Sequence, residues 1–179
     1  MYLPVADGDI PVIVKLINRA YRGGDGASGW STEEAYLAGD RTTESLLRAD
    51  IEAKPSASLL KWQDERSEEI VGSVWLEPLD DDTWYLGSLA IDPQRQNGGL
   101  GRAMLAAAED WVRKRGANRV RMKVINVREA LIAWYVRRGY ARTGASEPFP
   151  YQDDRFGKPL RDDLSFVVLE KPLYSGDAY

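Results

Sequence analysis

A glycine-rich turn between an apolar strand and a helix constrains this chain more than any other feature. Apolar residues dominate positions 86–91, glycines follow at Gly98, Gly99 and Gly101, and a helical pattern begins at once. Glycine leaves the backbone unshielded, so successive N–H groups can point into one concavity, and the helix N-terminus adds partial positive charge. The turn is therefore expected to bind an anion. The alternative is a tight turn without a ligand, since such turns also need glycine.

Two common phosphate-binding motifs do not fit this turn. A P-loop carries Lys directly after its last glycine, and here Arg102 follows Gly101. A dinucleotide fingerprint that began at Gly99 would place its third glycine on Met104, and basic residues stand within 119–123, where an acidic residue is expected. Neither a P-loop nor a Rossmann fold is therefore predicted.

Two other motifs do match. Residues 96–101 fit the pattern Q/R-x-x-G-x-G/A, and residues 126–140 place an Asn at a strand end before a helix that carries Tyr135 shortly before Gly139 and Tyr140. In these motifs the chain resembles the GNAT family of acetyl-CoA-dependent N-acetyltransferases, well over residues 71–143 and loosely on the flanks. The resemblance implies one α/β domain over residues 1–179, with a mixed, mostly antiparallel sheet that is flanked by helices and splayed near the glycine turn.

The resemblance also implies a site for acetyl-CoA. Backbone amides of the turn would hold the pyrophosphate, and the strand before the turn would pair with the pantetheine arm. The implied cofactor-binding residues are Leu89, Ala90, Ile91, Gln96, Asn97, Gly98, Gly99, Leu100, Gly101, Arg102, Asn126 and Tyr135. For Asn126, capping of the helix that follows is an equal alternative. An acyl group longer than acetyl is left open.

Tyr135 is the candidate general acid. A phenol with a pKa near 10 stays protonated at neutral pH and can protonate the thiolate of coenzyme A as it leaves. The alternative is a core aromatic residue beside Trp134. The general base is less defined, because the position at which many family members carry Glu falls near Tyr85. Glu77 on the neighbouring strand can act through water, although an exposed edge residue explains it as well, and a water chain would leave no trace in the sequence.

The resemblance implies that the acceptor binds at the loop between the first two helices and at the long loop near the C-terminus. The candidate substrate-binding residues there are Tyr21, Arg22, Trp30, Trp84 and Phe149. Each aromatic residue can instead anchor its own loop. If these residues line a pocket, the acceptor amine has an apolar or planar part and an acidic group near Arg22.

Composition excludes several kinds of chemistry. The 179 residues include no Cys and no His, so the chain has no thiol nucleophile and lacks the commonest general base and metal ligand. We therefore expect no metal site. Without a protein thiol, direct attack of the amine in a ternary complex is favoured over an acetyl-enzyme.

Charge and hydropathy suggest the partners and the compartment. A net charge of −4 argues against nucleic-acid binding, and the chain shows neither a targeting signal nor a membrane segment. A cytoplasmic protein that acetylates a small-molecule or peptide amine is expected, and a homodimer is a candidate oligomer. A non-catalytic acyl-CoA-binding regulatory module is the alternative function. The missing carboxylate favours it, and Tyr135 argues against it.

Periodicity and turn residues predict the remaining elements. The expected elements are a strand at 2–6, helices at 7–21, from 31 onward and at 43–52, an antiparallel meander of strands at 58–63, 70–79 and 83–92, a helix at 100–116, a strand at 120–125, a helix at 126–139 and a strand at 165–170. Residues 143–164 are expected to form a long loop.

Overall fold

The computed structural model describes residues 1–23 and 32–173. They form a seven-stranded sheet in the order β1-β3-β4-β5-β6-β9-β7, in which only β5 and β6 are parallel neighbours. The strands are β1 Tyr2–Pro4, β3 Ser58–Gln63, β4 Ile70–Pro78, β5 Thr83–Ile91, β6 Arg119–Ile125, β7 Ala141–Pro148 and β9 Ser165–Pro172. A small second sheet joins β2 Leu37–Ala38 to β8 Lys158–Pro159. The mixed, mostly antiparallel sheet is confirmed.

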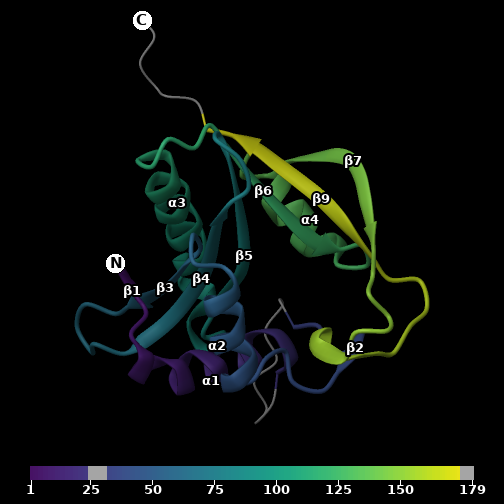
Figure 1. Ribbon diagram of the computed structural model, residues 1–179, viewed down its shortest axis with the longest axis horizontal. Helices are drawn as coiled ribbons and strands as arrows, with labels where there is room; N and C mark the ends of the chain where they lie inside the picture. The colour runs from purple at the N-terminus through teal and green to yellow at the C-terminus, as the bar shows by residue number, and fades with distance from the viewer. Residues whose placement is uncertain (24–31, 174–179) are drawn as a thin grey trace, which may run out of the picture.

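Helices cover both faces of the large sheet (Figure 1). They are α1 Ile10–Arg22, α2 Glu44–Ala53, α3 Leu100–Arg113 and α4 Glu129–Val136, with short 3-10 turns η1 Asp7–Asp9, η2 Pro93–Gly98 and η3 Asp154–Phe156. One buried cluster joins α3 and α4 to one face, and a second joins α1 and α2 to the other. Within the described residues, no helix has the length and apolar character to cross a membrane.

The meander and the helices follow the predicted pattern because their apolar residues recur on one side. In α1, Ile13, Leu16, Ile17 and Ala20 are buried, at the i, i+3, i+4, i+7 spacing of an amphipathic helix. In β4, Val74 and Leu76 are fully buried against α3, as alternation along a strand requires. These elements form the packed centre of the sheet beneath the site.

The two halves of the sheet separate beyond the start of β5. This strand pairs with β6 only from Thr83–Arg119 to Tyr85–Arg121. In Figure 1, β5 and β9 lie nearer to each other at the upper end, on either side of β6, and diverge toward α1 and β2. The predicted splay is therefore confirmed.

A bulge in β5 lies beside this opening. Ser73 pairs with Ala90 and Trp75 with Gly87, so the single residue between them on β4 faces both Ser88 and Leu89. Ser88 adopts φ 47°, which is unusual for a residue other than glycine. The bulge redirects the β5 backbone next to the opening.

Three local predictions are wrong. Described residues 32–43 form turns and β2 in place of a helix, because Glu33 is drawn into a buried ion pair and Leu37 pairs with β8. The expected loop at 143–164 contains most of β7, an exposed edge strand without the apolar alternation that marks a strand, as well as η3 and β8. The third wrong prediction is the cap of α4, where the N-cap is Arg128 and not Asn126. The other predicted elements are present, with ends shifted by a few residues.

Candidate active site

Three adjoining cavities lie in and beside the opening between β5 and β6. The central cavity, of about 410 Å³, lies between α1, β5, β6 and residues 147–156. The glycine-turn groove, of about 220 Å³, is bounded by residues 96–102, the end of β5 and α4. The α2 cavity, of about 290 Å³, lies between α2, β4 and β5. The central cavity shares Tyr21, Leu89, Arg128, Leu131 and Tyr135 with the groove, and Arg41, Tyr85, Gly87, Ser88 and Phe156 with the α2 cavity.

Backbone conformation and close packing require glycine in the turn. Gly99 has φ +77° and is the N-cap of α3, which begins at Leu100. A Cβ on Gly101 would lie 2.9 Å from Cδ1 of Ile91, so a side chain there would collide with β5. A Cβ on Gly98 or Gly99 would meet nothing within 4 Å. The first turn of α3 therefore presents its N–H groups beside a groove with room for a ligand.

Arginines give the groove positive charge. Arg102, Arg128 and Arg138 line it. The Arg138 guanidinium stacks 3.6 Å from the Trp134 ring, and its Nε is buried without a hydrogen-bond partner in the described part of the chain. Burial, followed by the neighbouring Arg137 and Arg102 cations, lowers the pKa of Arg138. An anion in the groove would relieve this repulsion, so the groove fits a phosphate-bearing ligand.

Three residues of this groove were not predicted from the sequence. Leu131, Trp134 and Arg138 line it beside Tyr135, and none of the three was predicted. Their spacing at positions 131, 134, 135 and 138 is that of one helix face, and this pattern would have revealed them. Gln96 and Arg102, which were predicted, do line the groove. Asn97 lies in η2.

Tyr135 lies where the groove meets the central cavity. Its side chain is held edge-on between Trp134 and Tyr140, at ring distances of 5.0 and 5.6 Å. Only 7% of the residue is exposed, and burial raises its pKa. The phenol therefore stays protonated at neutral pH, as a proton donor requires.

The end of β5 forms the wall opposite α4. Leu89 and Ile91 line the groove, whereas the Ala90 side chain points to the other face and packs beneath α1. The Tyr21 hydroxyl donates to the Leu89 carbonyl oxygen at 3.4 Å. Ala90 can therefore contact a ligand in the groove only through its backbone.

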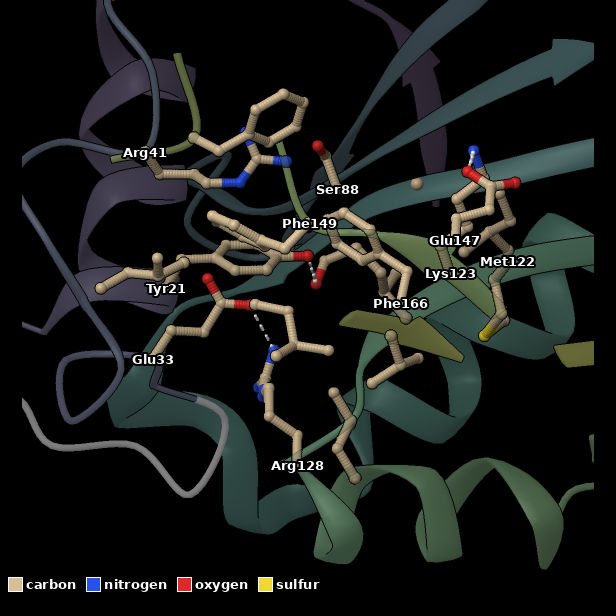
Figure 2. A pocket seen from close by; sticks show the side chains of 18 of the residues that line it. Tyr21, Glu33, Arg41, Ser88, Met122, Lys123, Arg128, Glu147, Phe149 and Phe166 are labelled. Carbon is tan, nitrogen blue, oxygen red and sulfur yellow. Dashed lines mark hydrogen bonds and ion pairs between the residues drawn. The ribbon is translucent and has the colours of Figure 1, made fainter. Parts of the chain in front are cut away.

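A buried ion-pair network that the sequence did not reveal forms part of the central cavity (Figure 2). Glu33 accepts from Arg22 at 2.5 Å and from Arg128 at 2.9 Å, and all three side chains are less than one-tenth exposed. Each nitrogen of the Arg22 guanidinium donates to a protein oxygen, because Nε bonds Gly39 and Nη2 bonds Phe156. Arg22 lines the cavity with its guanidinium held by these bonds, and its contact with an acidic substrate group stays a prediction.

Two predicted site residues are placed elsewhere. The side chain of Asn126 donates to the Asp163 carbonyl and accepts from the Ser165 amide, so it ties the end of β6 to β9 and lines neither the groove nor the central cavity. Trp84 packs edge-on against Trp111 in the core at the far end of β5. The geometry does not support their assignments to cofactor and substrate, which stay predictions.

The other predictions have mixed outcomes. Tyr21 and Phe149 line the central cavity. Glu77 lines the α2 cavity and not the central one, and it pairs with Lys54 at 2.7 Å. Trp30 lies outside the described residues.

The sequence model of the acetyltransferase (GNAT) family matches residues 15–140. The chain belongs to this family. Solved structures share its fold. A GNAT family acetyltransferase from Elizabethkingia anophelis with acetyl-CoA bound is 18% identical, with a TM-score of 0.61 over 73% of this chain and 84% of that one. The ribosomal-protein-alanine N-acetyltransferase from Brucella melitensis is also 18% identical, with a TM-score of 0.67 over 97% and 99%.

Curated relatives match only in part. A mycothiol acetyltransferase of Salinispora tropica is 29% identical over 79% of this GNAT chain and 49% of its own length. The chain thus spans about half of that protein, and about a fifth (19%) of the mycothiol acetyltransferase of Salinispora arenicola.

Proposed function

We propose that this GNAT protein is an acetyl-CoA-dependent N-acetyltransferase that transfers the acetyl group to a primary amine by direct attack in a ternary complex. The observation that carries the proposal is the junction of the glycine-turn groove with the central cavity at Leu89 and Tyr135. A donor in the groove and an acceptor in the cavity would meet at this junction, and such proximity is itself a large part of catalysis.

In this proposal the groove binds the donor through its backbone and its cations. The N–H groups at the start of α3, with Arg102 and Arg138, bind the pyrophosphate. Pairing between β5 and β6 ends at Tyr85, so the next stretch of β5 has no strand partner on the β6 side and can pair with the pantetheine arm. Acetyl-CoA supplies the activated acyl group.

Two elements act on the reacting carbonyl. Backbone N–H groups at the β5 bulge stabilise the negative charge that develops on the carbonyl oxygen. Tyr135 gives its proton to the departing sulfur. Glu77 lies one cavity away, so we assign proton acceptance from the amine to Glu147, which lines the central cavity and pairs with Lys123 at 2.6 Å.

Titration calorimetry with acetyl-CoA tests the donor site directly. We expect saturable binding of acetyl-CoA and coenzyme A, and none of NADH. The double variant Gly99→Val, Gly101→Val is expected to weaken acetyl-CoA binding at least tenfold, because both new side chains would fill the groove or displace β5.

The matched control is Gly8→Val. Gly8 has open space around its Cβ and lies in η1, away from the groove, so this variant should bind like the wild type. Thermal unfolding of each variant checks that it is folded. A folded double variant with unchanged affinity would contradict the assignment of the groove.

Thiol release with a panel of primary amines tests turnover. The names of the curated relatives support including mycothiol-related amines in the panel. Intersecting initial-rate lines are expected for a ternary complex. Parallel lines would contradict direct attack, and binding of acetyl-CoA without thiol release for any amine would favour a non-catalytic acyl-CoA-binding module.

A further inference from the structure

The charges of the central cavity carry an inference about the acceptor, which rests on the proposed acetyltransferase function. Among the described lining residues, four are cations and two are carboxylates. They are Arg22, Arg41, Lys123 and Arg128, against Glu33 and Glu147. The formal charge of the lining is therefore positive, which favours an anionic ligand and disfavours a polyamine.

Pairing within the cavity singles out Arg41. Glu33 is shared by Arg22 and Arg128, and Glu147 is paired with Lys123. The Arg41 guanidinium has no hydrogen bond and no ion pair with any described residue. In the α2 cavity, which Arg41 also lines, the other charges are paired as Lys54–Glu77 and Arg155–Asp50. Arg41 is thus the one cation of either cavity, among the described residues, without a carboxylate partner.

Arg41 is held in place for binding. Asn18 of α1 accepts from the Arg41 amide at 2.7 Å and from the Thr42 amide at 3.1 Å, and it donates to the Thr42 carbonyl at 2.9 Å. The guanidinium lies 5.5 Å from the Tyr21 ring and 5.7 Å from the Phe156 ring. These contacts orient the cation without neutralising it. The Arg41 side chain therefore loses little conformational entropy when an anion binds.

Arg41 also lies near the proposed reaction centre. The Tyr21 side chain connects Arg41 to β5, since its ring lies 5.5 Å from the guanidinium and its hydroxyl donates to the Leu89 carbonyl. Figure 2 shows Arg41 beside Tyr21, on the side of the cavity away from the Lys123–Glu147 pair. Phe149 and Phe166, which stack at 5.7 Å, supply apolar surface in the same cavity.

We propose that Arg41 binds an anionic group of the acceptor, so that the protein acetylates small primary amines that carry a carboxylate and an apolar body. The planar guanidinium matches a carboxylate in two parallel hydrogen bonds. Neutral amines and polyamines lack the group that Arg41 would bind, and they are poor acceptors.

Matched acceptors test this inference. We would measure kcat/KM for phenylalanine and 3-amino-3-phenylpropanoate, each beside its neutral carboxamide, and for spermidine. The wild type is expected to prefer each carboxylate at least tenfold over its amide. In Arg41→Gln this preference disappears, with acetyl-CoA affinity unchanged and the amides acetylated as before within about threefold. Arg41→Lys keeps part of the preference, because it keeps the charge but loses the planar fork.

The control is Arg119→Gln. Arg119 lies at the end of β6 away from the central cavity and is paired with Glu170, so this variant removes the same charge and should keep the full preference for carboxylates. The inference is overturned if Arg41→Gln retains the preference, if amides or spermidine are the better acceptors, or if no carboxylate is acetylated or bound by the coenzyme A-saturated protein. Acetylation of the neutral amines alone would leave the proposed function standing. Failure to bind acetyl-CoA would overturn that function first.

Discussion

At the scale of single residues, Glu33 joins three segments that are far apart in the sequence. Its carboxylate binds Arg22 at the end of α1 and Arg128 before α4, and its amide donates to the Tyr21 carbonyl at 2.6 Å. Removing one member of such a buried network leaves the remaining charges without compensation. Glu33 is therefore expected to matter for stability as well as for the shape of the central cavity.

We predict that Glu33→Gln lowers the free energy of unfolding by about 3 kcal/mol, because two buried guanidiniums lose their counter-charge. The matched control is Glu129→Gln, which breaks the exposed pair with Arg142 and should cost less than about 1 kcal/mol. Urea denaturation of both variants measures the difference. Equal losses would show that the Glu33 network contributes no more than a surface pair.

Tyr135 gives a second prediction at this scale. Tyr135→Phe should lower kcat about 100-fold by removing the proton donor, while the Kd for acetyl-CoA stays within about threefold of the wild type. Burial raises the pKa of Tyr135, so its ionisation should cause no loss of activity between pH 7 and 10. Tyr2→Phe is the control, because the Tyr2 hydroxyl is bonded to the Met104 carbonyl away from the cavities. Wild-type turnover in Tyr135→Phe would refute the role.

Residues in short motifs were predictable, and residues that pair across the fold were not. Gly99, Gly101 and Tyr135 belong to motifs whose spacing is visible along the chain. Glu33 meets Arg128 across 95 positions, a contact that no local pattern encodes. Arg41 was missed because its significance lies in the carboxylates around it, all of which are paired with other residues.

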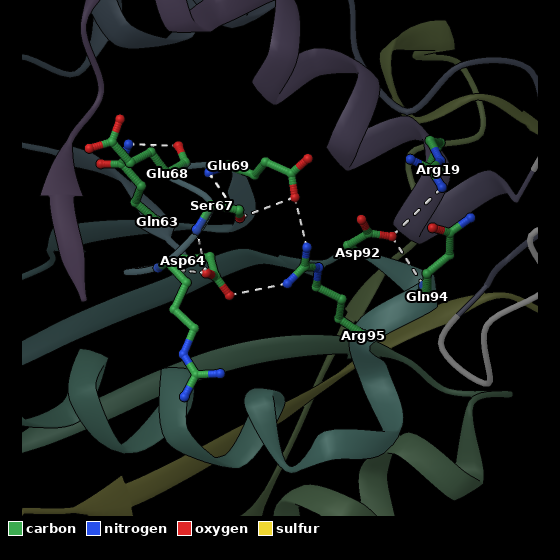
Figure 3. A network of polar contacts seen from close by, with 10 residues as sticks. Arg19, Gln63, Asp64, Ser67, Glu68, Glu69, Asp92, Gln94 and Arg95 are labelled. Carbon is green, nitrogen blue, oxygen red and sulfur yellow. Dashed lines mark hydrogen bonds and ion pairs between the residues drawn. The ribbon is translucent and has the colours of Figure 1, made fainter.

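At the scale of elements, η2 is fastened to the turn between β3 and β4 (Figure 3). Arg95 of η2 binds Asp64 at 3.1 Å and Glu69 at 2.7 Å, immediately before the residues of the glycine turn. Hydrogen bonds from the Ser67 and Arg66 amides lower the pKa of Asp64, so this carboxylate stays charged at neutral pH. The anchor holds the start of the turn whose amides are proposed to bind the donor.

We predict that Arg95→Ala weakens acetyl-CoA binding about threefold to tenfold, because a looser η2 holds the turn amides less firmly in the binding geometry. Thermal stability should change little, since exposed ion pairs contribute at most about 1 kcal/mol. Arg66→Ala removes an exposed cation from the same β3–β4 turn and should leave the affinity unchanged. Calorimetry measures both affinities. Equal affinities of the two variants for acetyl-CoA would show that the Arg95 ion pairs do not contribute to binding.

Elements with strong periodicity were predictable, and elements formed by pairing at the edge of the fold were not. The apolar repeat of α1 and the alternation in β4 are encoded locally. In contrast, β7 is exposed along most of its length and is a strand because β9 offers it hydrogen bonds. Likewise, β2 exists only through its partner β8.

At the scale of the whole molecule, buried phenols make the stability of the fold depend on pH. Burial raises the pKa of five tyrosines that are spread over both faces of the sheet and the cavities. They are Tyr2, Tyr21, Tyr85, Tyr135 and Tyr140, and for Tyr85 the pKa rises to about 12. Below pH 10 these phenols are neutral in both the folded and the unfolded chain, so they add no pH dependence there.

Above pH 10 the buried phenols lower the free energy of unfolding. The unfolded chain loses protons that the folded chain keeps, so the free energy of unfolding falls by about 1.4 kcal/mol per pH unit for each such phenol until its folded pKa is reached. We predict constant stability from pH 7 to 9.5 and a steep decline above pH 10, measured by urea denaturation with tyrosinate absorbance. Tyr85→Phe should make the decline shallower by one phenol's share up to about pH 12. Tyrosinate absorbance that develops fully before unfolding would show that the phenols ionise in the folded protein. That result would contradict the prediction that their burial lowers the stability above pH 10.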